Sequence, residues 1–414
     1  MTTAAITIPV ARQIKLPQAL SFAGTALAFV GITFAAGAPS PLFVVMQQQW
    51  GFPAWVLTIA FAIYAIGLLA ALLVAGSLSD HIGRRPVLLG ALVVEIVAMV
   101  LFVLAPNIGW IILARALQGI ATGAATSTFT ATIVELAPAN RKKLGTIISS
   151  TAPVGGLGLG ALATGIAVQF SDYPTTIIFG FLTVLFAVGV LVTVFSRETV
   201  SPRPGALKSL LPRLSVPVGA RPEFAASIPV HIATWMLAGI VLGLAPSIIR
   251  EVFHLDSGLL NGTLVALQPL AAVVSSLALS RLPGRRVILI GTLAVMLGVS
   301  LFLTAVLTGF FPLLFAAVII GGSGFGATFS GSLRLIAPLA DAHQRAELFA
   351  AVYLVSYLAY GVPALVVGEL IGVVGLFDAV IGYVVAILLA AAVGLIAQSR
   401  LARSQALVAG ALVE

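Results

Sequence analysis

Long apolar runs alternate with short polar breaks along the whole of this 414-residue chain. A helix that crosses the hydrocarbon of a bilayer needs about 20 mainly apolar residues, and glycine and proline inside such a run are tolerated. The pattern predicts twelve membrane-spanning helices, over residues 18–46, 54–79, 86–105, 108–137, 143–170, 175–196, 223–249, 258–280, 287–308, 311–338, 344–370 and 374–398.

The longest polar gap, residues 197–222, lies between the sixth and seventh runs. Prolines are frequent in it, and because proline fixes φ and lacks an amide donor, we expect a linker and not a packed domain. The chain is therefore predicted to be an all-α membrane protein in three parts. These are a six-helix bundle over residues 1–196, a linker over 197–222 and a second six-helix bundle over 223–414.

Matching segments indicate that the two bundles are repeats of one another. Gly83-Arg84-Arg85-Pro86-Val87-Leu88-Leu89-Gly90 is matched by Gly284-Arg285-Arg286-Val287-Ile288-Leu289-Ile290-Gly291, which keeps the basic residues but has no acid. Ala137-Pro138 and Ala337-Pro338 end the fourth and tenth runs. Two similar six-helix halves in parallel orientation are the build of one class of secondary transporter.

Basic residues give the expected orientation. Of the 21 lysines and arginines, all but Arg115, Arg250 and Arg334 fall on one side of the predicted topology. Cytoplasmic loops are enriched in Lys and Arg, so the linker and both termini are expected in the cytoplasm, which requires an even number of spans. Arg12 and Lys15 precede a run that is too long for a signal peptide and has no cleavage site, so we expect it to remain as a span.

Composition agrees with a chain embedded in lipid. Hydrophobic residues make up 60% of it and charged residues 8%, against about 25% charged residues in soluble domains. A net charge of +8 would suggest nucleic acid in a soluble protein, but here the charges lie in short loops, so lipid and not nucleic acid is the expected partner. Without cysteine, histidines at ligand spacing or a phosphate-binding Lys-Ser/Thr motif, no metal, ATP or other cofactor is expected.

Four segments resemble motifs of the major facilitator superfamily, and the resemblance covers the whole chain. They are Gly76-Ser77-Leu78-Ser79-Asp80-His81-Ile82-Gly83-Arg84-Arg85 between helices 2 and 3, Arg115-Ala116-Leu117-Gln118-Gly119 in helix 4, Glu135-Leu136-Ala137-Pro138-Ala139-Asn140-Arg141 at its end, and Pro153-Val154-Gly155-Gly156-Leu157-Gly158-Leu159-Gly160 in helix 5. The last resembles a motif found mostly in exporters, although Ala152 stands where the motif has glycine. Helix 1 also lacks the acid of many proton-coupled drug exporters. The resemblance implies a monomeric secondary transporter.

The resemblance also implies a conformational latch at the cytoplasmic ends of the helices. In it Arg84 bridges two acids, and Asp80 lies against the start of helix 11, where the helix dipole favours a negative charge. The latch would be closed when the protein opens outward and broken when it opens inward. Its expected members are Gly76, Asp80, Gly83, Arg84, Arg85 and Glu135. In helix 5, glycines permit close helix approach, and the motif residues are Pro153, Gly155, Gly156 and Gly160.

Charges inside the spans are candidates for function, because each costs about 2.5–3.5 kcal/mol by insertion scales. Arg115, followed by Gln118, lies about 10 Å below the outer surface by helical rise. It could bind an anionic group, or be a structural arginine satisfied by backbone carbonyls. Glu95 lies near the midplane of the third run. It could carry a coupling proton, or be a protonated side chain hydrogen-bonded to a neighbouring helix.

Polar and aromatic side chains mark the second bundle. His231 and Trp235 are four residues apart and share a helix face. Gln268, with its side-chain amide, directly precedes Pro269. A further stripe consists of Tyr353, Tyr357 and Tyr360. Such side chains could stack on a substrate and donate hydrogen bonds to it, or could pack between helices.

These features predict a transporter of the cytoplasmic (inner) membrane that moves a small molecule by alternating access. Proton-coupled efflux, an antiport, is the first interpretation, supported by the helix 5 motif. An importer or a metabolite carrier, with an anion met by Arg115, is the alternative. No clustered His/Asp/Glu site favours an enzyme, and an intramembrane arginine with a duplicated basic loop fits a channel poorly.

Overall fold

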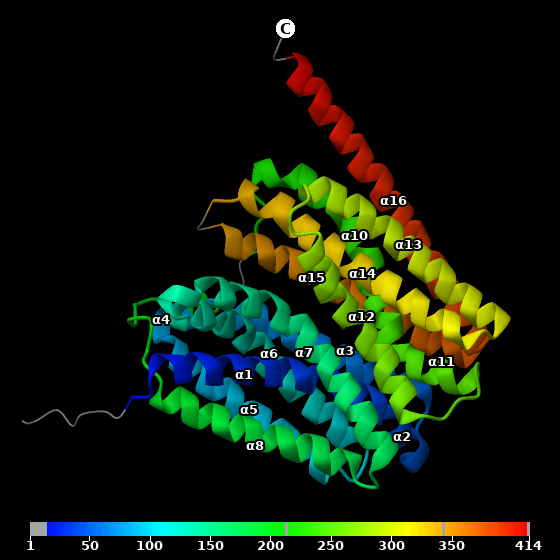
Figure 1. Cartoon of the computed structure of the whole chain (residues 1–414), viewed down its shortest axis with the longest axis horizontal. Coiled ribbons are helices and arrows are strands. Elements are labelled where there is room, and N and C mark those ends of the chain that lie inside the picture. The colour runs from blue at the N-terminus through cyan, green and yellow to red at the C-terminus, as the bar shows by residue number, and fades with distance from the viewer. Residues whose placement is uncertain (1–14, 212–213, 342–343, 412–414) are drawn as a thin grey trace, which may run out of the picture.

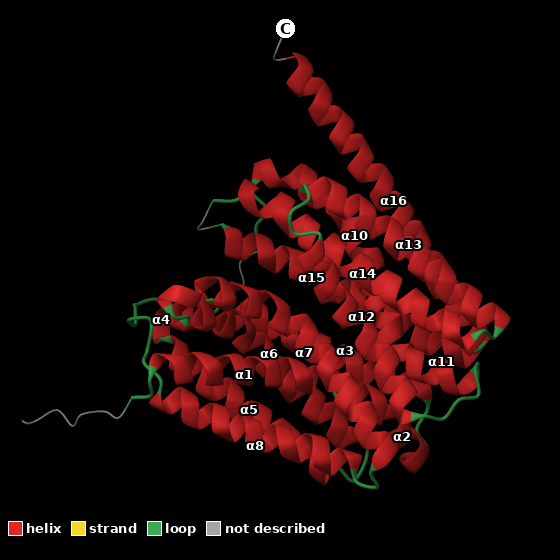
Figure 2. Ribbon diagram, in the orientation of Figure 1, coloured by secondary structure: helices red, strands yellow, loops and turns green. Residues whose placement is uncertain are grey.

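The computed structural model of the chain describes residues 15–211, 214–341 and 344–411. Arg12, which contributed to the predicted orientation, and the two predicted cytoplasmic ends at 1–14 and 412–414 lie outside the described residues. Every regular element in the described part is a helix (Figure 2). Twelve helices are long and apolar enough to cross a membrane, as the sequence predicts.

The first six spans come from the first half of the chain (Figure 1). The first span is made of two consecutive helices, and a single helical turn precedes the third. The elements are α1 (Gln18–Gly37), α2 (Pro39–Trp50), α3 (Ala54–Ala75), α4 (Ser79–Ile82), α5 (Arg84–Leu104), α6 (Ile108–Leu136), a 3-10 turn (Ala139–Arg141), α7 (Lys142–Phe170) and α8 (Pro174–Phe195).

The second six spans follow a connection that holds two short helical turns. The seventh span contains a π-helical segment between two α-helices. The elements are α9 (Ala206–Ser209), a 3-10 turn (Val218–Ala220), α10 (Arg221–Gly239), the π segment (Ile240–Leu244), α11 (Ala245–Glu251), α12 (Gly258–Ala278), α13 (Gly284–Thr308), α14 (Phe311–Ile336), a 3-10 turn (Ala337–Leu339), α15 (Arg345–Val374) and α16 (Leu376–Ala411).

Several predicted span boundaries need correction. The second span ends at Ala75 and not at residue 79, and the eleventh ends at Val374 and not at residue 370. The first span breaks at Ala38, because Pro39 cannot donate to the helix, and it continues to Trp50, where Gly51 adopts a positive φ of 66°. The ninth helix begins at Gly284 instead of residue 287. The last helix does not end near residue 398 but continues to Ala411 and projects beyond the bundle (Figure 1); its extension is rich in Ala, Leu and Arg, which favour helix.

The glycine motif of α7 packs this helix on two neighbours. On one side a Cβ at Gly156 or Gly160 would collide with α1, against which α7 packs. On the other side a Cβ at Gly158 would lie 3.1 Å from the Ala266 carbonyl and the Pro269 ring of α12. Missing side chains let helix backbones approach closely, so α7 joins the first bundle to the second.

The two bundles meet most closely at the membrane face opposite the basic loops. There the Cα of Gly262 would lie 2.6 Å from a Cβ built on Gly165, so the backbones of α7 and α12 almost touch. Nearby, the Ser40 hydroxyl donates to the Leu242 carbonyl at 2.7 Å. We call these contacts, with those of Gln47 to Arg250 and of Gln169 to Ser257, the far seal.

Among the described residues, every side-chain hydrogen bond between α1–α8 and α10–α16 belongs to the far-seal side of the membrane. Figure 1 shows the bundles close together near α2 and α11 and diverging towards α4 and the start of α15. The bundles are therefore joined by side-chain hydrogen bonds at the far face and, among the described residues, by none at the face that carries the basic loops, here named the basic face.

Replacing Gly262 by valine is expected to prevent closure of the far seal, because the new side chain would meet the α7 backbone at Gly165. Overpacking of this kind costs about 1–3 kcal/mol, enough to shift a two-state equilibrium about tenfold. The chain has no native cysteine, so a membrane-impermeant maleimide can report on Ser40→Cys alone, which is buried in the wild-type seal.

We expect slow labelling of Ser40→Cys from the far side, and faster labelling once Gly262→Val is added. Gly180→Val is the matched control, because a Cβ there meets nothing within 4 Å. Equal labelling in all three backgrounds would contradict the assignment of the far seal.

Candidate functional site

The loop between α3 and α5 folds around a glycine that no other residue could replace without strain. Gly83 has a φ of 100°, in the left-handed region that favours glycine. A Cβ at this position would also lie 2.7 Å from the Glu198 carboxylate. The start of the loop is fixed by the Ser127 hydroxyl, which donates to the Gly76 carbonyl at 2.8 Å.

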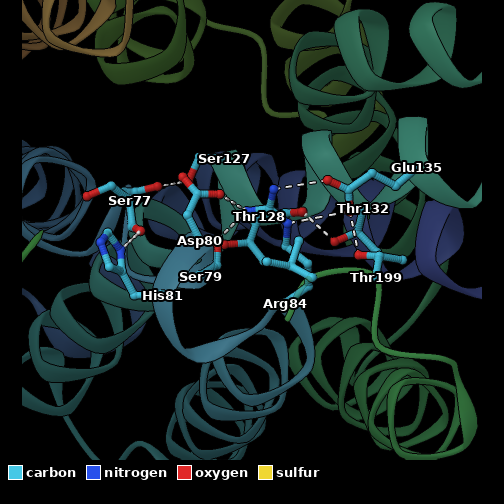
Figure 3. Close-up of polar contacts among 12 residues, drawn as sticks. Ser77, Ser79, Asp80, His81, Arg84, Ser127, Thr128, Thr132, Glu135 and Thr199 are labelled. Carbon is cyan, nitrogen blue, oxygen red and sulfur yellow. Dashed lines mark hydrogen bonds and ion pairs between the residues drawn. The ribbon is translucent and has the colours of Figure 1, made fainter. Parts of the chain in front are cut away.

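The structure brings together three of the predicted latch residues (Figure 3). The Arg84 guanidinium lies 2.5 Å from the Asp80 carboxylate and 3.0 Å from that of Glu135, and it also donates to Ser79 at 2.8 Å. The Thr199 hydroxyl donates to Glu135 from the other side. Within the described residues these contacts join elements of the first bundle only, and the Asp80 side chain is 57% exposed.

Arg85 and Glu198 fasten the loop to its own bundle. Arg85 donates to the backbone carbonyls of Thr193 and Val194, which end α8. The Glu198 carboxylate accepts the amide groups of Arg84 at 2.8 Å and Arg85 at 3.0 Å, so it caps the start of α5, where the helix dipole favours a negative charge. Sequence reasoning missed Glu198; an acid directly after the last residues of the sixth run was the available signal.

The second bundle holds its basic loop with an acid from another helix. The loop has no acid, but Arg285 pairs with Glu223 at the start of α10 and donates to Gln405 of α16 at 2.5 Å. The acidic partner of this loop therefore comes from α10 and not from the loop itself. Arg334, placed inside a span by the sequence, lies near the end of α14 and donates to the Ser280 carbonyl at 2.9 Å.

Arg115 is buried in the first bundle, where it is 1% exposed. Its Nε atom donates to the Ala60 carbonyl at 3.2 Å, and one terminal nitrogen donates to Gln118 at 2.5 Å and lies 3.5 Å from the Ala36 carbonyl. Its guanidinium carbon lies 4.0 Å from the centroid of the Tyr64 ring, a cation–π contact. The geometry favours the structural arginine of the two alternatives in this conformation, because backbone carbonyls and an amide take its donors.

Glu95 is fully buried and faces α6. One carboxyl oxygen accepts the Thr122 hydroxyl at 3.0 Å, and the other has no partner among the described residues. Tyr64 lies close to Thr122, Glu95 and Arg115. A buried carboxyl without a cationic contact is stable in its neutral form, so Glu95 can hold a proton here.

The predicted tyrosine stripe belongs to a larger aromatic cluster in the second bundle. The Trp235 ring lies 5.1 Å from that of Tyr357, 6.4 Å from that of Tyr360 and 5.4 Å from that of Phe325. Tyr353 and Phe329 extend the cluster to His231. We call it the aromatic cluster; its members are Trp235, Phe325, Phe329, Tyr353, Tyr357 and Tyr360, all of them partly exposed.

Sequence reasoning missed the two phenylalanines of α14, although their spacing of four residues shows that they share a face. Tyr357 also packs against the buried group that contains Tyr64 and Leu68 of α3. The aromatic cluster therefore reaches the surface that the second bundle turns towards the first.

Several buried polar atoms of the predicted site residues have no partner among the described residues. They include the Trp235 indole nitrogen, the His231 Nε2 atom, both amide atoms of Gln268 and the Gln118 amide nitrogen. Buried polar groups without partners are costly and uncommon. All of these atoms are buried in this conformation, so a rearrangement would be needed before they could bond to a molecule between the bundles. Among the described residues there is no group of three His, Cys, Asp or Glu side chains that could hold a metal.

Comparison with known proteins identifies the family. The profile of the Major Facilitator Superfamily matches residues 25–359. The chain belongs to this superfamily. It is therefore an integral membrane transporter and not an enzyme, and the likeness of its loops to superfamily motifs reflects true membership.

Individual relatives cover small parts of this transporter. Citrate exporter 1 of Aspergillus niger is 33% identical over 133 residues, which are 31% of this chain and 25% of that protein. An uncharacterized MFS-type transporter of Mycobacterium tuberculosis is 40% identical over 75 residues, 18% of this chain and 11% of that protein. The chain thus spans a quarter or less of the length of these curated relatives.

The fold has a close match among solved structures. A bacterial homolog to the human lysosomal transporter Spinster, in an inward-facing and occupied conformation, superposes with a TM-score of 0.69. The match covers 91% of this transporter and 96% of that chain at 12% identity. At this identity the likeness establishes the fold alone.

Replacing Asp80 by asparagine is expected to lower transport while substrate binding in detergent persists. The change weakens the pair with Arg84 and removes the charge offered to the second bundle, but it lies at the basic face, away from the aromatic cluster. Transport in vesicles and binding to the purified protein are the two measurements. Loss of binding by a correctly folded Asp80→Asn variant would contradict the latch. Asp172→Asn, in the α7–α8 loop at the far face, is the control.

Proposed function

We propose that this transporter exports a small, partly apolar molecule across the cytoplasmic membrane in exchange for protons, with the basic face in the cytoplasm. The observation that carries the proposal is the aromatic cluster with its unpartnered hydrogen-bonding atoms. It offers ring faces for stacking and a few polar contacts for orientation, the composition of sites that take small organic ligands.

The mechanism follows from the two ends of the molecule. In the present conformation the far seal is closed, so a substrate would reach the aromatic cluster from the cytoplasm. Rocking of the bundles would then open the far seal while the loop with Asp80 and Arg84 meets the start of α15. The aromatic cluster would thereby be exposed to each side in turn.

Glu95 is the proposed proton carrier. Its neutral form suits the buried position beside Thr122, and its ionised form would need water or a cation. Movement of α5 against α6 would change that environment. Tyr64 lies close both to Glu95 and to Tyr360 of the second bundle. Proton release from Glu95 would thus be coupled to a change in the packing of α3 and α6 against the aromatic cluster.

A carrier of metabolites or anions, importing or exporting, is the second candidate. The segment shared with Citrate exporter 1 and the buried cation Arg115 favour it. Against it, two nitrogens of the Arg115 guanidinium already donate hydrogen bonds, to the Ala60 carbonyl and to Gln118. The two candidates differ in the substrates that they accept, which makes them separable by experiment.

Expression of the chain in a drug-hypersensitive bacterium is expected to raise tolerance to planar aromatic compounds, and the gain should vanish when the proton gradient is collapsed. Trp235→Leu should abolish the gain for most of the panel, because it removes the ring at the centre of the cluster. Growth and accumulation of a fluorescent compound are the measurements.

Trp110→Leu is the matched control, since that ring is exposed on α6 away from the aromatic cluster. Two results together would overturn the export of aromatic compounds in favour of the anion carrier. The wild-type chain would leave drug tolerance unchanged, and vesicles that contain it would transport citrate or another organic anion.

Glu95→Gln is expected to abolish uptake driven by a pH gradient in everted vesicles while leaving substrate exchange without a gradient intact. Glutamine keeps the size and the hydrogen bond from Thr122 but cannot exchange a proton. Asp378→Asn in the first turn of α16, where the acid is exposed at the far face, is the control. Unchanged gradient-driven uptake in Glu95→Gln would show that another group carries the proton.

A further inference from the structure

A pocket of about 250 Å³ lies at the basic face of the first bundle, outside the proposed transport path. It is bounded by the start of α1, the end of α6 and the residues that follow α8. Its lining residues are Leu16, Gln18, Ser21, Leu136, Arg197, Glu198 and Thr199. One water requires about 10–15 Å³. The pocket is far larger, so a larger polar group fits.

Two donors in this pocket lack partners within the described part of the chain. The Ser21 hydroxyl is 1% exposed and makes no hydrogen bond. Arg197 is exposed and forms none of the ion pairs found among the described residues. Lys15 adds a second cation at the rim, because the Leu16 amide donates to the Phe195 carbonyl at 2.9 Å and brings residue 15 close to residue 197.

The acid in the lining does not oppose an anion strongly. The Glu198 oxygens accept the amides of Arg84, Arg85 and Thr199, so this charge is offset by the start of α5. Gln18 is likewise occupied, donating to the Leu136 carbonyl at 3.1 Å. The free groups are therefore a guanidinium, a nearby ammonium and a hydroxyl.

We propose that this pocket binds a phosphate group, held by Arg197 and Ser21. A guanidinium matches phosphate oxygens with paired donors, and the buried hydroxyl supplies a third donor from the pocket wall. The position at the membrane boundary admits two sources of the group, the headgroup of an anionic phospholipid or a phosphate compound in solution.

Occupancy of the pocket would bear on the latch. Thr199 lines the pocket, and its hydroxyl donates to Glu135, which pairs with Arg84. A phosphate that accepts the Thr199 hydroxyl would compete with the hydrogen bond from Thr199 to Glu135. It would also add negative charge near Arg84. The site is thus a regulatory one, separate from the path of the exported molecule.

Binding to the purified full chain tests the proposal without any need for transport, so its failure leaves efflux untouched. Phosphatidylglycerol is titrated in native mass spectrometry, and inorganic phosphate in a thermal unfolding assay. We expect Arg197→Gln and Ser21→Ala each to weaken binding about tenfold, the effect of losing one charge-assisted or buried hydrogen bond.

Arg203→Gln is the matched control, with the same change of charge in the same connection but outside the pocket. A loss seen with phosphatidylglycerol assigns the site to lipid, and a loss seen with inorganic phosphate in lipid-free detergent assigns it to a soluble phosphate. If neither probe separates Arg197→Gln and Ser21→Ala from Arg203→Gln, the phosphate site is refuted.

Discussion

Hydrocarbon contains no water, and this constraint shapes the polar contacts inside the spans. A charged or polar group inside the bilayer must find its partner within the chain. Arg115 finds backbone carbonyls of α1 and α3 together with Gln118. At the basic face, Arg85 and Arg334 bond the carbonyls that end α8 and follow α12. These arginines therefore donate mainly to backbone carbonyl groups. The buried polar atoms without partners are the candidates for contact with a ligand.

The two halves are repeats, yet they hold their basic loops by different means. In the first half Arg84 meets Glu135 and Asp80, whose carboxylates are 32% and 57% exposed. In the second half Arg285 meets Glu223, which is 7% exposed and also bonded by Gln405. An exposed carboxylate can change partners at little cost, whereas a buried one cannot. We therefore expect the movable part of the proposed latch in the first half.

The sequence predicts the spans well because lipid demands long apolar runs, and it predicts the basic loops because they repeat the same residues. The partners of these loops were harder to foresee. Glu198 lies 114 residues from Arg84, and Glu223 lies 62 residues from Arg285, so no local pattern joins them. Gly165 and Gly262 were likewise hidden, since a glycine signals that something approaches closely but not which helix does so.

The far seal and the latch depend on different physics, and this difference bears on how transport is controlled. The far seal rests on the close approach of Gly165 and Gly262 and on hydrogen bonds such as that of Ser40 to Leu242, and no ion pair crosses it among the described residues. The latch rests on charges near water, where each exposed pair is worth about 0–1 kcal/mol and is screened by salt. About 1.4 kcal/mol changes an equilibrium tenfold, so modest events at the latch can reset the balance between the two conformations. A ligand that binds at Glu135, Arg84 or Thr199 would therefore shift this balance at the proposed latch, as overpacking at Gly262 would shift it at the far seal.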